Sequence, residues 1–167
     1  MTKDTKIKLS SKDDASGVQE LQYQLNKKGG TIIYQMPISI KREGRHLIRF
    51  RGVDMVGNKE NAQALVIIVD NTPPEITETF SVANTGTQMT KDSTRLTVYP
   101  RRTSVFIECK DTSCGTKSIW YSINGAKEKE YNKPVSFSKE GVYALMMRSI
   151  DNLGNEAKKT VSFVIQE

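Results

Sequence analysis

The chain carries one octet twice: VDMVGNKE occupies residues 53–60, and IDNLGNEA occupies residues 150–157. Superposing the octets also brings residues 34–52 into register with residues 131–149, at a constant separation of 97 residues. Further upstream, KDDASG aligns with KDTSCG and LQYQLN aligns with IWYSIN, both at a separation of 98 residues. Each copy has the size of a domain, so the sequence predicts two tandem copies of one domain.

Apolar and polar residues alternate within each copy, which is the pattern of strands with one buried face. No long stretch has helical periodicity, and turn signals separate the short alternating segments. This pattern predicts a β-sandwich in each copy. The positions expected to face inward are Ile7, Leu9, Leu21, Tyr23, Leu25, His46, Ile48, Phe50, Ala64, Val66 and Ile68 in the first copy, and Val105, Ile107, Ile119, Tyr121, Ile123, Tyr143, Leu145, Met147, Val161, Phe163 and Ile165 in the second.

A DNTPPE stretch separates the copies, and its two prolines cannot continue a central strand. We therefore expect a first repeat over 1–70 that lacks its leading strand, a linker over 71–75 and a second repeat over 76–167. Asp54 and Asp151 each precede a Gly-Asn pair, which is typical of a tight turn. The repeated octet is therefore interpreted as a turn that occurs twice because the domain occurs twice.

Two cysteines lie close together in ECKDTSCG. A metal site would need further ligands, and the one histidine, His46, is distant in sequence. A local disulfide between Cys109 and Cys114 is therefore predicted, and it would place the protein in an oxidising compartment. Two free thiols are the alternative. Because the first copy has Ser11 and Ser16 at these positions, the bridge is expected to stabilise the fold without being required for it.

The formal net charge of +6 comes from 25 basic and 19 acidic residues that are interleaved along the chain. Interleaved charge indicates ordinary solubility more than a polyanion site, and we predict no nucleic-acid partner. No apolar run is long enough to span a bilayer, and the opening MTKDTKIKLSS does not have the apolar core of a signal peptide. The sequence contains no GxSxG, HExxH or glycine-rich phosphate loop, so we predict no catalytic activity.

The combined motifs resemble a known family. KDDASG, then YQMPISI, then EGRHLIRFRGVDMVGN, then DNTPP is similar to the immunoglobulin-like repeats that occur in tandem in surface-exposed and outer-membrane-associated proteins of Gram-negative bacteria, spirochaetes included. The resemblance covers nearly all of both copies. It implies two immunoglobulin-like (fibronectin-III-like) β-sandwiches, an extracytoplasmic location, and a monomeric segment of a longer array that serves as a spacer and adhesive module.

Calcium at the junction between the repeats is a less favoured alternative to a metal-free linker. Sandwich topology would bring Asp111 and Asp151 toward Asp70, and Ca²⁺ prefers such oxygen ligands. No clustered DxD motif supplies the remaining ligands, so no cofactor is expected.

Two outward-facing sets of residues are candidate binding surfaces. In the first copy, Arg45, Arg49 and Arg51 share one face of a strand, which is either a solvated charged face or a stripe that binds an anionic group. In the second copy, Trp120 and Met146 are expected to form an apolar patch flanked by Arg148. We therefore predict a non-catalytic module that binds a protein or glycan at the cell surface. The alternative is a carbohydrate-binding or accessory module of a larger secreted glycan-active enzyme.

Overall fold

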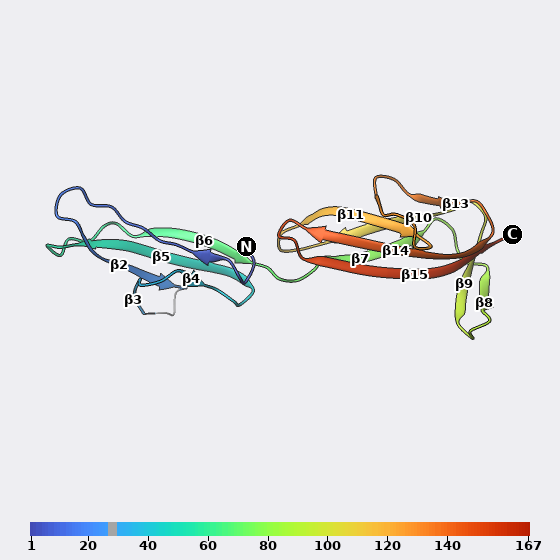
Figure 1. Cartoon of the computed structure of the whole chain (residues 1–167), viewed down its shortest axis with the longest axis horizontal. Helices are drawn as coiled ribbons and strands as arrows, with labels where there is room; N and C mark the ends of the chain where they lie inside the picture. Colours follow the sequence, from blue (N-terminus) through green and yellow to red (C-terminus); the bar gives the residue numbers. More distant parts are fainter. Residues whose placement is uncertain (27–29) are drawn as a thin grey trace. The chain divides into compact units, whose positions relative to one another are not determined.

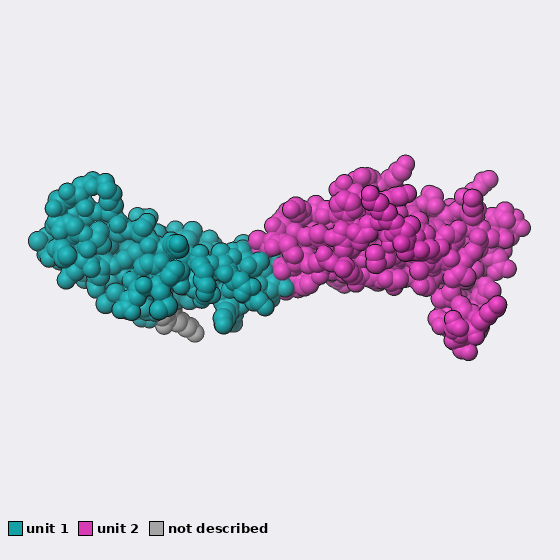
Figure 2. Space-filling view, viewed as in Figure 1, with its two compact units in different colours: residues 1–71 teal, residues 72–167 magenta. Residues whose placement is uncertain are grey.

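A computed structural model describes residues 1–26 and 30–167. The described residues form strands and no helix, so no helix among them is long and apolar enough to cross a membrane. The chain divides into two compact units, Met1–Asn71 (unit 1) and Thr72–Glu167 (unit 2), which Figure 2 colours separately. Each unit places two sheets around its own apolar core, so the predicted fold of two tandem immunoglobulin-like β-sandwiches is confirmed.

The described residues of unit 1 form six strands (Figure 1). Its larger sheet has the order β3-β2-β5-β6, and β1 pairs with β4 to form the second sheet. All of its strand pairs are antiparallel. The strands are β1 (Lys6–Ile7), β2 (Val18–Leu25), β3 (Ile32–Ile33), β4 (Ile38–Ser39), β5 (Gly44–Asp54) and β6 (Gln63–Val69).

Unit 2 contains nine strands (Figure 1). Its larger sheet has the order β12-β11-β14-β15-β9-β8, and its smaller sheet has the order β13-β10-β7. The pair formed by β15 and β9 is parallel, which no strand pair of unit 1 matches among the described residues. The strands are β7 (Glu75–Phe80), β8 (Gly86–Met89), β9 (Arg95–Pro100), β10 (Thr103–Lys110), β11 (Thr116–Ile123), β12 (Lys129–Glu130), β13 (Val135–Phe137), β14 (Gly141–Asp151) and β15 (Glu156–Gln166).

Alternation along the strands builds the two cores. In β5, His46 and Ile48 are buried while Arg45 and Arg49 on the other face are exposed. In the equivalent strand β14, Leu145 and Met147 are fully buried. Aromatic rings fill the core of unit 2, where Phe163 contacts several others edge-on. The buried apolar clusters are Leu9, Leu21, Ile38, Ile40, Ile48, Ile67 and Val69 in unit 1, and Ile76, Val105, Ile107, Val135, Phe137, Leu145, Met147, Phe163 and Ile165 in unit 2.

The repeated octet forms the predicted turn in both units. The Asp54 carboxylate accepts hydrogen bonds from the backbone N–H groups of Val56 and Asn58, at 3.0 and 2.8 Å. The Asp151 carboxylate accepts the equivalent pair, both at 2.8 Å. Gly57 and Gly154 each have a φ of 90°, which a side chain would strain.

The predicted inward face of the last strand of unit 1 is wrong. Ile67 and Val69 of β6 are buried, whereas Val66 and Ile68 are each 48% exposed and Ala64 is also exposed. The pairing explains the difference, because His46 lies opposite Ile67 whereas its equivalent in unit 2 lies opposite Phe163. This strand therefore aligns with β15 at a separation of 96 residues, since the hairpin of unit 1 contains one extra residue. A shift of one residue exchanges the two faces of a strand.

Candidate functional site

The arginine stripe of unit 1 lies along β5. Arg45, Arg49 and Arg51 occupy alternate positions on the face opposite to the buried His46 and Ile48, as predicted from the alternation. Arg45 and Arg49 are exposed, and Arg51 is partly buried. The stripe therefore presents guanidinium groups on the outer surface of the larger sheet.

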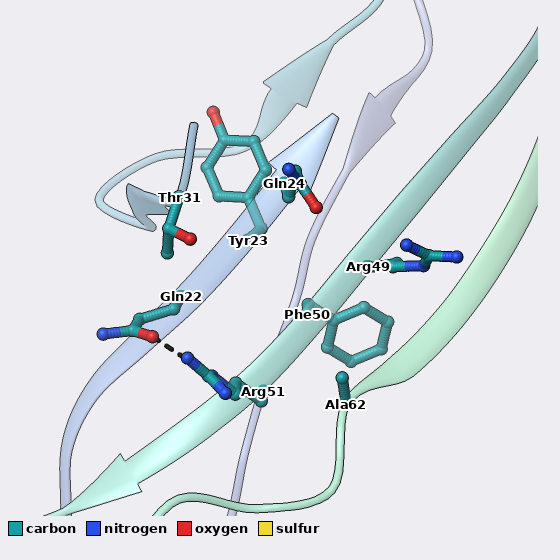
Figure 3. Close-up of a pocket in the computed structure, with 8 residues that line it drawn as sticks. All are labelled: Gln22, Tyr23, Gln24, Thr31, Arg49, Phe50, Arg51 and Ala62. Carbon is teal, nitrogen blue, oxygen red and sulfur yellow. Dashed lines mark hydrogen bonds between the residues drawn. The ribbon is translucent and has the colours of Figure 1, made fainter. Parts of the chain in front are cut away.

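A pocket of about 190 Å³ opens beside two of these arginines (Figure 3). It includes Arg49 and Arg51 but not Arg45, which lies further along the strand. Polar residues of β2 and of the segment before β3 contribute hydrogen-bonding groups to its wall. The lining residues are Gln22, Tyr23, Gln24, Thr31, Arg49, Phe50, Arg51 and Ala62.

Strand pairing sets the position of the Arg51 side chain. Gln22 lies directly opposite Arg51, and its amide oxygen accepts a hydrogen bond from Arg51 Nε at 3.2 Å (Figure 3). The amide nitrogen of Gln22 in turn donates to the carboxylate of Glu20. The contact through Nε leaves the terminal nitrogens of the guanidinium group for another acceptor, such as the two oxygens of a carboxylate or sulfate.

No carboxylate neutralises the stripe within unit 1. Among residues 1–26 and 30–167, no Asp or Glu oxygen lies within 4.0 Å of the guanidinium nitrogens of Arg45, Arg49 or Arg51. Its nearest link to an acid is the indirect one from Arg51 through Gln22 to Glu20. The pocket therefore carries the positive charge of two arginines that no ion pair of the described residues neutralises.

The equivalent arginine of unit 2 is fully paired. Arg148 donates from Nε and Nη2 to both oxygens of Glu128, with the shortest contact at 2.7 Å, and its Nη1 lies 3.5 Å from Glu156. The hydrogen bond from Arg148 lowers the pKa of Glu128, and the same contact raises the pKa of Arg148. The two units thus place arginine at the same position, but among residues 1–26 and 30–167 only Arg148 of this pair has acidic partners.

The strand register of unit 2 places Trp120, Met146 and Arg148 on one face, and the role of this patch in binding stays a prediction. Trp120 lies on the outward face, where it pairs directly with Arg148, and the Arg148 guanidinium carbon lies 5.7 Å from the ring centroid. Met146 pairs with the buried Ser122, two residues further along the strands. The Trp120 indole N–H donates to the hydroxyl of Ser118 at 3.2 Å. The Arg148 guanidinium group thus lies over the ring of Trp120.

Acidic turns lie at one end of each sandwich. In unit 2, the Asp111 carboxylate accepts backbone hydrogen bonds from Ser113, Cys114 and Gly115, and these bonds lower its pKa, that from Cys114 most strongly. Burial raises the pKa of Asp151, but hydrogen bonds, chiefly from Asn155, outweigh that effect and leave the pKa lowered.

Two of the three predicted calcium ligands come together within unit 2. Asp111, Cys114 and Asp151 each place one ligand atom within 4.8 Å of those of the other two. The third, Asp70, belongs to unit 1, where it follows β6 and donates its backbone N–H to the carbonyl of Met1. The carboxylates of Asp111 and Asp151 already accept hydrogen bonds, so a cation would compete with those donors. The absence of calcium from the linker stays a prediction, with calcium as the less favoured alternative.

The predicted disulfide between Cys109 and Cys114 is not formed in the structure. Each thiol has its own neighbour. Cys109 lies in β10, packs against the core and hydrogen-bonds to Ser149, while burial raises its pKa. Cys114 lies in the following turn and hydrogen-bonds to the carboxylate of Asp151, in the place where Ser16 of unit 1 donates to Asp54 at 3.0 Å.

Sequence reasoning missed the polar partners of the arginines. Gln22 and Thr31 in the pocket belong to no sequence motif. The antiparallel pairing of β2 with β5 places Gln22 opposite Arg51. Glu128 lies just before β12 in a loop, where periodicity gives no information about side-chain direction. These polar partners determine which arginine is free to bind.

Comparisons with known proteins were made for the sequence and for the structure. No family model matches the sequence, and no curated protein matches it. Among solved structures, the chain is similar to the fibronectin(III)-like modules of Clostridium thermocellum CbhA, with 8% identity, a TM-score of 0.42 and coverage of 93% of this chain and 82% of that one. It is also similar to Drosophila N-cadherin EC1-3, with 12% identity, a TM-score of 0.35 and coverage of 89% of this chain and 56% of that one. Because both TM-scores are low, the fold is assigned from the strand topology described above and not from these similarities.

Proposed function

We propose that this chain is a non-catalytic pair of immunoglobulin-like modules that acts as a spacer and binds a protein or glycan partner through the arginine stripe of unit 1. The observation that carries the proposal is the difference between two equivalent arginines. Arg148 is held by Glu128 and Glu156, whereas Arg51 contacts the neutral amide of Gln22. The resemblance of the repeats to immunoglobulin-like repeats of bacterial surface proteins supports a location at the cell surface or in the periplasm.

The chemistry of the pocket favours an anionic group on the partner. Arginine keeps its proton at all physiological pH values, so Arg49 and Arg51 act as binding groups and not as proton-transfer groups. A guanidinium group matches the two oxygens of a carboxylate or sulfate, and the Gln22 amide and Thr31 hydroxyl can orient such a group. A pocket of about 190 Å³ fits one acidic side chain or one sulfated sugar ring better than a whole substrate.

The experiment measures binding of the full chain to an acidic peptide, a sulfated oligosaccharide and a neutral oligosaccharide at several salt concentrations. The test variant is the double substitution Arg49→Gln and Arg51→Gln. The matched control is Arg101→Gln with Arg102→Gln, which makes the same change in charge at exposed positions of unit 2. We expect the test variant to lose binding of at least one anionic probe roughly tenfold or more, as for a lost charged hydrogen-bonding pair, while the control stays within about twofold.

Other outcomes count against the proposal. Equal losses in both double variants would mean that net charge alone attracts the probe. Binding of the neutral sugar that depends on Trp120 would instead favour the carbohydrate-binding module. If neither anionic probe binds at low salt, the arginine stripe is only a solvated face.

A further inference from the structure

The outer face of the larger sheet in unit 1 combines the arginine stripe with an apolar pair. Along β5, the half-buried Leu47 occupies the outward position between Arg45 and Arg49. Val66 of β6 lies directly opposite Leu47, so these two residues form the apolar pair. Directly paired residues of an antiparallel ladder lie on the same face, so cationic and apolar surface alternate along β5.

Unit 2 is polar at the positions where β6 is apolar. Because β6 aligns with β15 at a separation of 96 residues, Val66 corresponds to Ser162 and Ala64 corresponds to Thr160. Val66 is 48% exposed, and Ser162 and Thr160 are exposed as well. Ser162 lies before the part of β15 that pairs with β9, so exposure at this position does not depend on that pairing. The sandwich thus accepts hydroxyl side chains here, and its packing does not require the apolar surface beside the arginines.

Two pockets lie along the stripe. The first is the pocket beside Arg49 and Arg51 (Figure 3). The second, of about 220 Å³, is lined by Asn26, Arg45, His46 and Leu47. Each residue of a strand advances the chain by about 3.3 Å, so Arg45 and Arg51 are separated by roughly 20 Å along β5. A ligand that reaches both pockets is therefore longer than one acidic side chain or one sugar ring.

No outward aromatic ring of the described residues accompanies these arginines. The Tyr and Phe residues of unit 1 are Tyr23, Tyr34 and Phe50, and all three pack against its buried cluster. In unit 2, Trp120 occupies the outward position that Gln22 occupies in unit 1. The face of an aromatic ring attracts the C–H groups of a sugar, whereas an aliphatic side chain packs well against the apolar pair. The surface beside the arginines therefore suits a polypeptide better than a glycan.

We propose that the arginine stripe binds an extended polypeptide segment whose alternate residues are acidic, apolar, acidic and acidic. The acidic side chains bind Arg45, Arg49 and Arg51, and the apolar side chain packs on the apolar pair. Charge complementarity selects acidic residues, because no ion pair among residues 1–26 and 30–167 involves these arginines. Alternate residues are about 6.6 Å apart both in β5 and in an extended partner, so one segment reaches all four positions. The inference rests on the proposed function, because it names the partner of the same stripe.

The test uses the full chain and three labelled peptides of identical composition, with binding followed by fluorescence anisotropy at low salt. Two peptides carry the pattern in opposite directions, as Asp-Ser-Val-Ser-Asp-Ser-Asp and Asp-Ser-Asp-Ser-Val-Ser-Asp. The third peptide groups the acids, as Asp-Asp-Asp-Val-Ser-Ser-Ser. We expect one patterned peptide to bind roughly fivefold or more tightly than the grouped peptide, because only a patterned peptide places one acid over each arginine.

Protein variants separate the charged and the apolar parts of the pattern. Arg45→Gln should weaken binding of the patterned peptide roughly fivefold or more, because a charged hydrogen-bonding pair is lost. Val66→Thr should weaken it about fourfold, as expected for the loss of about one methylene group of apolar contact. The matched control, Val142→Thr, makes the same change at a valine of β14 that is 57% exposed, and binding should stay within about twofold.

The remaining outcomes distinguish failure of this inference from failure of the proposed function. Equal binding of grouped and patterned peptides, or unchanged binding by Val66→Thr, would overturn the inference. If Arg49→Gln with Arg51→Gln still weakens peptide binding in that case, the proposed function stands without the extended partner. Tighter binding of a sulfated oligosaccharide than of either patterned peptide would also overturn the inference and leave a glycan as the partner of the stripe. If no anionic probe binds at low salt, both the proposed function and this inference fail.

Discussion

Two neighbouring isoleucines of β6 provide a direct test of the register. The change is Ile67→Ala in one variant and Ile68→Ala in another. Ile67 is 8% exposed and belongs to the buried cluster of unit 1, while Ile68 is 48% exposed on the opposite face. The alignment of the repeats at a constant separation would reverse these roles, so the pair discriminates between the two registers.

The magnitudes follow from burial. Removing a buried isoleucine side chain costs about 2–5 kcal/mol, because a cavity is added to the lost transfer free energy. Full burial of such a side chain contributes about 1.5–3 kcal/mol, so the half-exposed Ile68 should lose about 1 kcal/mol with no cavity. The lower strand propensity of alanine affects both variants. We therefore expect Ile67→Ala to cost about 1–4 kcal/mol more than Ile68→Ala.

Urea unfolding of the full chain measures both effects. Trp120 is the one tryptophan and lies in unit 2, so its fluorescence follows that unit, while circular dichroism follows both. The part of the dichroism change that fluorescence does not follow reports on unit 1. If Ile67→Ala leaves unit 1 unfolded, the Ile67→Val and Ile68→Val pair provides a milder comparison, of about 0.5–1.5 kcal/mol for the buried site. A larger cost at Ile68 than at Ile67 would refute the register.

Four further predictions concern unit 2. Gly154→Ala should lower its free energy of unfolding by about 1 kcal/mol or more because φ is positive there, and an unchanged melting temperature would contradict this. Because the folded-state pKa values of Asp111 and Asp151 are lowered, their contribution to the free energy of unfolding is present above the ordinary pKa of about 3.9 and is lost as the pH falls through the lowered values. Acid unfolding followed by fluorescence checks this, and the Asp151→Asn variant should be less sensitive to pH. Both cysteines should react with a thiol reagent without prior reduction, Cys109 more slowly because its pKa is raised, and a mass that rises by two hydrogen atoms on reduction would show a disulfide instead. Calcium should not raise the melting temperature, because both carboxylates already accept hydrogen bonds, and a rise that Asp151→Asn abolishes would show a metal site.

The sandwiches were predictable because their signals are local and occur twice. Alternation identifies the inward face of β5 and β14 from their own residues, as the burial of Ile48 and Leu145 shows. The turn of the repeated octet needs only the carboxylate of its aspartate and a glycine at positive φ. Features determined within about ten residues are well encoded in the pattern of the sequence.

The face of β6 was not predictable from the repeat alone. One extra residue in the β5–β6 hairpin does not change the composition or the alternation of the strand. It nevertheless places Ile67 in the core instead of Ile68. All three of Val66, Ile67 and Ile68 are β-branched and apolar, so the sequence pattern is equally consistent with either register. Only the pairing with β5 distinguishes the two.

The candidate site depends on a difference that no motif contains. Alternation placed Arg51 and Arg148 correctly on outer faces, but their availability depends on which side chains lie opposite and beside them. Gln22 leaves the charge of Arg51 uncompensated, whereas Glu128 reaches Arg148 from a loop and neutralises it. Loop side chains take their direction from the tertiary fold, so the binding capacity of an arginine at an equivalent position becomes apparent only when both units are compared in three dimensions.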